Sequence, residues 1–175
     1  MIVKEGTAVP FFIAQMNLQQ QIQALVEEKI AGTDNYLVEI KVSPSKITVI
    51  LDHPRSLNLD ECVAVSRYLH EQLETSNVFE KHELEVSSPG MEEPLKVLPQ
   101  YHKRLNHRVS VLQFDGMKRT GLLRAADEHG ILLDEEYTIK EGKKKTIGHR
   151  EVTISYDQIK ETRVIFSFDK INSPS

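Results

Sequence analysis

The sequence predicts an α+β protein in two parts: a helix-strand-strand-helix-strand unit, followed by a small five-stranded β-barrel. Two observations support this fold class. In the first half, apolar residues recur at helical spacing in some segments and at strand spacing in others. The second half instead shows short alternating runs that are separated by tight, mostly glycine-containing turns.

The first unit opens with a helix and a hairpin. Residues 17–31 (NLQQQIQALVEEKIA) repeat apolar side chains at helical spacing, with Asn17 as a candidate N-cap and Gly32 as a stop. The runs YLVEIKV (36–42) and ITVILD (47–52) alternate around the turn SPSK, which predicts a β-hairpin. The inward face predicted for the first run consists of Tyr36, Val38, Ile40 and Val42.

A second helix and a third strand complete this unit. Asn58 followed by Glu61 resembles a capping box and opens a helix that extends to about Thr75. The run HELEV (82–86) then alternates, with its leucine and valine facing in and its glutamates facing out. We expect two helices on one side of a three-stranded sheet. The stripe of the second helix that faces this sheet is predicted to be Leu59, Cys62, Val63, Ser66, Leu69 and Leu73.

The second unit is predicted to contain only strands. Because a flat sheet of such short strands would expose its edges, a strongly bent barrel is favoured. Residues 155–160 (SYDQIK) are too short for a full helix and are expected to form a turn before the last strand. The five predicted strands cover residues 108–114, 117–126, 131–139, 146–154 and 162–168.

A proline-interrupted segment separates the two units. Pro94 and Pro99 keep residues 91–107 from forming one long helix, although a single helical turn remains possible there. The predicted domains are therefore residues 1–98 and 108–175, joined by an ordered linker of residues 99–107.

Composition excludes several classes of function. The 175-residue chain has no apolar run long enough to span a bilayer, and its start lacks a basic leader, so a cytoplasmic protein is expected. Its single cysteine, Cys62, cannot form an internal disulfide. The seven histidines show no ligand-like spacing, so neither a metal nor another cofactor is expected.

Charge is divided unevenly along the chain. Residues 1–100 carry 8 Lys and Arg and 15 Asp and Glu, a balance of −7, whereas residues 101–175 carry 14 and 11, a balance of +3. An acidic half of this kind suits a basic protein partner and is repelled by phosphates. The alternative is ordinary solubilising charge.

The segment SSPG (87–90) permits three interpretations. A nucleophile at Ser87 or Ser88 would need an oriented base, but the G-x-S-x-G elbow is absent and His82 lies in the same strand. A phosphate cradle would need a glycine-rich run and a lysine. A turn suits the residues best, because Pro89 presets φ and Gly90 accepts the positive φ of a type II turn. The flanking serines are then expected to hydrogen-bond freed backbone groups.

The wider segment HELEVSSPGMEEPL (82–95) resembles the signature of the ribosome maturation factor RimP family, whose usual form is close to LEVSSPG, an apolar residue and Asp-Arg-Pro-Leu. The similarity covers almost the whole chain and includes YDQIKETRVIF (156–166) near its end. The resemblance implies an N-terminal KH-like domain and a C-terminal Sm-like (SH3-like) barrel. It also implies a non-enzymatic role in maturation of the small ribosomal subunit, with ribosomal protein twelve of that subunit as a partner.

One departure from the family pattern stands out. Where the family usually has Asp-Arg-Pro-Leu, this chain has Glu92, Glu93, Pro94 and Leu95, so an acid replaces a basic residue. The resemblance therefore does not extend to any phosphate contact that would need a basic residue at this place.

The two halves differ in their potential for RNA contact. The first half has glycines only at positions 6, 32 and 90, so it lacks the GXXG loop with which KH domains grip RNA. In the second half, Arg108, Lys118, Arg119, Arg124 and Lys143–Lys145 are candidates for contact with ribosomal RNA, and a merely solvated hairpin tip is the alternative. The candidate binding residues of the whole chain are Glu83, Glu85, Ser87, Ser88, Pro89, Gly90, Pro94, Leu95, Arg108, Lys143, Lys144 and Lys145.

These observations together predict a monomeric, cytoplasmic assembly factor that binds the immature small ribosomal subunit through ribosomal protein and rRNA contacts. A free-standing RNA-binding regulator of Sm-like type is the alternative. Because such regulators generally form rings through barrel edges, a monomeric mass in solution would count against it.

Overall fold

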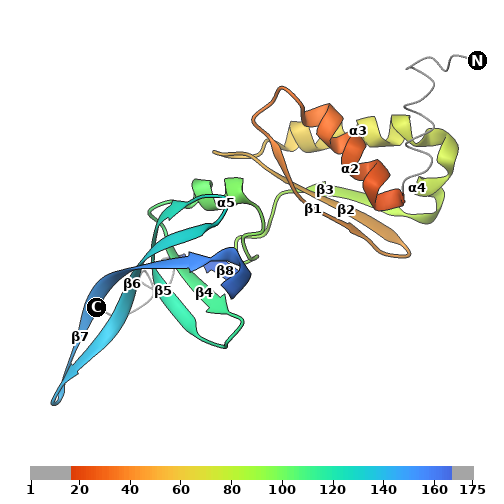
Figure 1. Cartoon of the computed structure of the whole chain (residues 1–175). Coiled ribbons are helices and arrows are strands. Elements are labelled where there is room, and N and C mark those ends of the chain that lie inside the picture. Colours follow the sequence, from red (N-terminus) through yellow and green to blue (C-terminus); the bar gives the residue numbers. More distant parts are fainter. Residues whose placement is uncertain (1–16, 167–175) are drawn as a thin grey trace, which may run out of the picture. The chain divides into compact units, whose positions relative to one another are not determined.

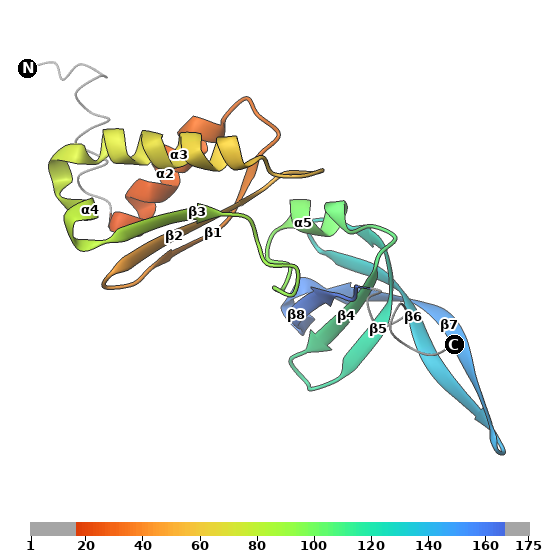
Figure 2. The ribbon, with the colours of Figure 1, turned by 180° about the vertical axis from the view of Figure 1, so that it is seen from behind.

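The computed structural model describes residues 17–166, so the expectations about the start of the chain and about the strand beyond residue 166 lie outside the described residues. The chain divides into two compact units, of which the first ends at Pro89 and the second begins at Gly90 (Figures 1 and 2). In the described part of the chain, no helix is both long and apolar enough to cross a membrane.

The first unit has the predicted helix-strand-strand-helix-strand order. Helices α2 (Leu18–Ile30) and α3 (Leu59–Gln72) cover one face of the sheet (Figure 1). In that sheet β2 (Lys46–Asp52) lies between β1 (Tyr36–Val42), to which it is antiparallel, and β3 (Glu83–Ser87), to which it is parallel. Two short helical segments that the sequence did not predict, η1 (Glu74–Ser76) and α4 (Val78–Lys81), follow α3.

Both predicted helix starts are confirmed at atomic detail. The side chain of Asn17 accepts a hydrogen bond from the backbone of Gln20 at 2.8 Å, and Gly32 follows the helix with a φ of 80°. Asn58 accepts from the backbone of Asp60 at 2.9 Å, and Glu61 accepts from the backbone of Asn58 at 3.2 Å. These side chains satisfy N–H groups that the first turn leaves unpaired.

Two predicted inward faces are partly wrong. On α3 the buried stripe contains Cys62, Val65 and Leu69, whereas Leu59 and Val63 are 75% and 46% exposed. At 100° per residue, Val63 points well to the side of a stripe centred on Cys62 and Leu69. On β1 a bulge between Leu37 and Glu39 shifts the alternation. Of the predicted inward residues Tyr36, Val38, Ile40 and Val42, Ile40 is buried as predicted, and Leu37 packs against the core in place of the other three.

The second unit is a five-stranded antiparallel sheet in the order β7-β6-β5-β4-β8. No ladder joins β7 to β8 among residues 17–166, so the predicted barrel is an open sheet in its backbone pairing. The last strand also begins earlier than predicted, directly after the short segment η2 (Tyr156–Gln158). The strands are β4 (Arg108–Gln113), β5 (Lys118–Ala126), β6 (Gly130–Glu141), β7 (Lys144–Ser155) and β8 (Ile159–Val164).

The core of the second unit lies on one face of this sheet. Its buried members include Val109, Val111, Leu123, Leu133 and Ile154, which come from four strands. Helix α5 (Leu98–Lys103), which begins one residue before the predicted linker, adds Tyr101 to this core. Strands β6 and β7 are 12 residues each, and their hairpin extends past the ends of the neighbouring strands (Figure 1).

Candidate functional site

The signature strand β3 presents an acidic outer face. Leu84 and Val86 pack against the core of the first unit, and Glu83 and Glu85 are exposed, as the alternation predicted. Lys46 on β2 lies beside them, with its Nζ 2.6 Å from Oε2 of Glu85. The hydrogen bond to Glu85 raises the pKa of Lys46. One of the two acids is therefore already paired within the unit.

The SSPG corner differs from the predicted type II turn. Gly90 does not have a positive φ, in contrast to Gly32, Gly116 and Gly142. The tight turn lies further along the chain, where the backbone N–H of Glu93 donates to the carbonyl of Gly90 at 3.1 Å. The proline-glycine pair thus leads into a turn that Gly90 begins, because Met91 and Glu92 occupy its two central positions.

The serines of this corner have no catalytic surroundings among the described residues. Neither the hydroxyl of Ser87 nor that of Ser88 makes a hydrogen bond within residues 17–166, which also contradicts their predicted role in holding the turn. The nearest histidine in the sequence, His82, has its Nδ1 3.0 Å from the carbonyl of Val78, next to α4. A charge-relay arrangement is not built here.

The residues after the corner attach to the edge strand of the second unit. The N–H of Leu95 donates to the carbonyl of Thr162 on β8 at 2.8 Å, and Arg163 donates to the carbonyl of Glu92. The negative charges of Glu93 and Glu92 contribute to a raised pKa of Arg163, whose main cause is its hydrogen bond with Glu161. The acids that depart from the family pattern therefore lie beside an arginine of this same chain.

A shallow groove of about 600 Å³ follows this attachment. Pro94, Leu95 and Tyr101 line it together with Tyr156, whose hydroxyl is buried without a hydrogen-bond partner among the described residues. Burial raises the pKa of Tyr156 to about 12. The groove gives Pro94 and Leu95 a packing role within the second unit.

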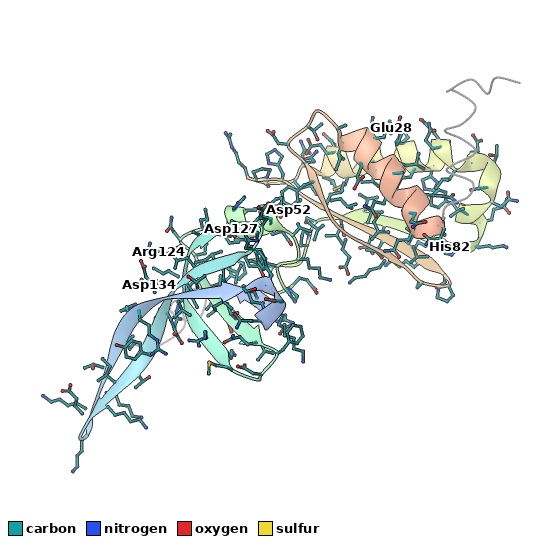
Figure 3. The ribbon with its side chains drawn as sticks, viewed as in Figure 1. Glu28, Asp52, His82, Arg124, Asp127 and Asp134 are labelled. Atoms are coloured by element: carbon teal, nitrogen blue, oxygen red, sulfur yellow. The ribbon has the colours of Figure 1, made fainter. Side chains whose placement is uncertain are left out.

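All three arginines predicted to face RNA are paired with acids. Arg108 makes two hydrogen bonds to the carboxylate of Glu136, at 3.1 and 2.8 Å. The Nη2 atom of Arg124 lies 3.6 Å from Oδ2 of Asp134. Both side chains are labelled in Figure 3. Such pairs leave less positive charge for an external phosphate. Lys118 has no ion pair within the described part of the chain.

A buried carboxylate that the sequence did not single out organises the base of the β6–β7 hairpin. Oε2 of Glu135, whose side chain is 8% exposed, accepts hydrogen bonds from Arg119 at 2.7 Å and from Arg150 at 2.9 Å. Burial alone would raise the pKa of Glu135, but the hydrogen bond from Arg150 and the charges of both arginines outweigh it and lower that pKa. The signal in the sequence was an acid at an inward position of an otherwise apolar strand, ILLDE.

Within the described residues, the hairpin tip carries the largest group of lysines without an ion pair. The turn itself consists of Gly142, with a φ of 63°, and Lys143, while Lys144 and Lys145 already belong to β7. All three lysines are exposed, and their side chains make no ion pair or hydrogen bond within residues 17–166. They are the candidate RNA-contacting residues that the structure leaves most available.

The described residues contain no group of three or more His, Cys, Asp or Glu side chains that could hold a metal ion. The two units present charged surfaces. The first presents the acidic outer face of β3, and the second presents a hairpin whose tip carries lysines. Such features define a class of binding protein that meets charged partners through its surface.

Comparison with known proteins identifies the family. Residues 22–92 match the family model described as the RimP N-terminal domain. The chain is 36% identical over 146 residues to the ribosome maturation factor RimP of Porphyromonas gingivalis, which covers 82% of this chain and 95% of that protein. It is 30% identical over 165 residues to the protein of the same name in Cytophaga hutchinsonii, which covers 88% and 97%. This chain belongs to the RimP family of ribosome maturation factors, which are not enzymes.

Proposed function

We propose that this protein binds the immature small ribosomal subunit in the cytoplasm and stabilises an assembly intermediate until a ribosomal protein is in place. The main support is the match to curated ribosome maturation factors along most of the chain. This mechanism requires no chemical step. A factor that binds one assembly intermediate more tightly than the others shifts the population toward that intermediate.

The charge distribution suggests a division of labour between the units. The acidic face of β3, with Glu83 and Glu85, suits a strongly basic ribosomal protein, and we propose ribosomal protein twelve of the small subunit. The hairpin lysines Lys143, Lys144 and Lys145 suit ribosomal RNA. The SSPG corner and residues Pro94 and Leu95 would act indirectly, by fixing how the chain enters the second unit.

Co-sedimentation tests this function directly. The protein, as a monomer, should travel with immature small subunits and not with mature ones. Cells that lack it should accumulate immature small subunits, most clearly in fast growth. Equal association with mature and immature particles, together with an unchanged subunit profile on depletion, would contradict the proposal.

A further inference from the structure

The guanidinium of Arg150 is held in place from two sides. Its Nε donates to Oε2 of the buried Glu135, and its central carbon lies 4.8 Å from the ring centroid of Tyr137. The side chain is nevertheless 55% exposed. Within residues 17–166 its two terminal nitrogens make no hydrogen bond, although the guanidinium as a whole is ion-paired with Glu135.

The position of the Tyr137 ring depends on a glycine. Tyr137 on β6 is the direct cross-strand partner of Gly148 on β7. A Cβ added at Gly148 would lie 2.7 Å from Cζ and 2.9 Å from the hydroxyl of Tyr137, so any other residue would push the ring away. The ring therefore lies against the backbone of β7, where it flanks Arg150.

The same face of β7 continues toward the lysine tip. Side chains alternate along a strand, so Lys144, six positions or about 20 Å from Arg150 along β7, faces the same side. Lys143 follows in the turn, and Lys140 and Lys145 lie opposite each other on the other face. Glu141, the cross-strand partner of Lys144, is the one acid at this end of the hairpin. The resulting strip is cationic and longer than a single phosphate.

We infer that Arg150 is a phosphate-binding residue, positioned by Glu135 and Tyr137, and that this face of the β6–β7 hairpin contacts an RNA backbone from Arg150 to Lys143. An oriented guanidinium donates two parallel hydrogen bonds to phosphate and loses little side-chain freedom on binding. The inference rests on the proposed function, because a ribosomal particle supplies the RNA. The inference adds Arg150 to the lysines of the tip as an RNA-contacting residue, and it assigns Glu135 and Tyr137 the role of positioning Arg150.

Binding of the full-length chain to naked small-subunit ribosomal RNA, measured over a series of salt concentrations, tests this role. Arg150→Gln should weaken binding about three- to tenfold and make the salt dependence shallower by about one counterion. Arg150→Lys should keep the salt dependence and lose part of the affinity, because an ammonium lacks the fork. Arg67→Gln removes the same charge from an exposed site on α3 and should change neither quantity.

Glu135→Gln separates positioning from charge. Removing a negative charge should by itself strengthen RNA binding, whereas loss of the group that orients Arg150 should weaken it. Tyr137→Leu leaves the charge unchanged and should also weaken binding, which keeps the test open if Glu135→Gln does not fold. Thermal unfolding of each variant shows that it is folded.

Sedimentation of the same variants with immature subunits distinguishes the two proposals. If the wild-type chain does not co-sediment, the proposed function fails. If it does, but Arg150→Gln and Arg67→Gln bind RNA alike, the role of Arg150 is wrong and the function stands. If Arg150→Gln instead lost binding to a ribosomal protein while its RNA affinity stayed unchanged, the hairpin would contact a protein partner and the inference would be overturned.

Discussion

The hydroxyl of Tyr101 on α5 donates a hydrogen bond to Oγ1 of Thr162 on β8, at 2.9 Å, and both residues are buried. The carbonyl of the same Thr162 accepts from the N–H of Leu95. These two bonds hold the segment that follows the SSPG corner against an edge strand, whose free backbone groups would otherwise invite pairing with another chain.

The first prediction concerns this contact. Tyr101→Phe should lower the free energy of unfolding by about 1 kcal/mol, because it leaves the buried hydroxyl of Thr162 without its partner. Thr162→Val should cost a similar amount. In the double variant both polar groups are gone, so the loss should be smaller than the sum of the two. Denaturant unfolding of the four proteins measures this, and simple additivity would show that the bond contributes nothing to stability.

A pH dependence follows from Glu135. Its pKa in the folded protein is below the usual 4.5, so the ionised carboxylate stabilises the fold fully above pH 4.5. This contribution is lost as the pH falls through the folded-state value. Glu135→Gln should therefore be less stable than wild type by about 1.5 to 3 kcal/mol at neutral pH, and the gap should narrow below pH 4.5.

Glu151→Gln is the matched control for this prediction. Glu151 is exposed on the opposite face of β7, and its replacement should change stability by less than about 0.5 kcal/mol. Chemical unfolding of the three proteins at pH 7 and pH 4 gives the comparison. A gap between Glu135→Gln and wild type that is constant with pH would mean that the charge of Glu135 is not its stabilising feature.

The glycines permit a third prediction. Gly90 lacks a positive φ, and a Cβ there would meet only Cγ of Glu93, at 3.3 Å, on a side chain that can move. Gly90→Ala should be neutral or slightly stabilising, because it reduces the freedom of the unfolded chain. Gly116→Ala, at a φ of 89° in open space, should cost about 1 kcal/mol or more through backbone strain. Thermal unfolding measures both effects. If Gly90→Ala were the more destabilising of the two variants, the type II turn with a positive φ at Gly90 would be the correct assignment.

Local chemistry explains what the sequence predicted well. Asn17 and Asn58 cap helices through groups two or three residues away, and such short-range patterns are visible in one dimension. The exposed glutamates of β3 follow from alternation in the same way. The lysine tip was found because a glycine and three lysines are adjacent in the chain.

The features that the sequence predicted wrongly or missed depend on contacts between segments that are distant in the chain. The bulge after Leu37 appears only when β1 is paired with β2, and it turns Leu37 toward the core while Ile40 stays inward as predicted. The sequence did not single out Glu135, because Arg119 and Arg150, which neutralise it, lie 16 and 15 residues away in sequence. The corner at Gly90 was misplaced because proline and glycine suit several turns, and the attachment of residues 92–95 to β8 selects among them.

The acidic face of β3 supports the last prediction. Reversing Glu83 and Glu85 to lysine should slow association with the basic ribosomal protein, because rim charges act mainly on the association rate. The change also breaks the exposed pair between Lys46 and Glu85, which contributes little to stability, so the variant should remain folded. The control variant, Asp34→Lys with Glu74→Lys, makes the same change in net charge at exposed sites away from β3 and should slow association less.

Association rates measured at two salt concentrations test this prediction, because steering by the β3 face predicts a larger difference between the two variants at low salt. Equal rates for both variants would assign the effect to net charge and leave β3 without a specific role.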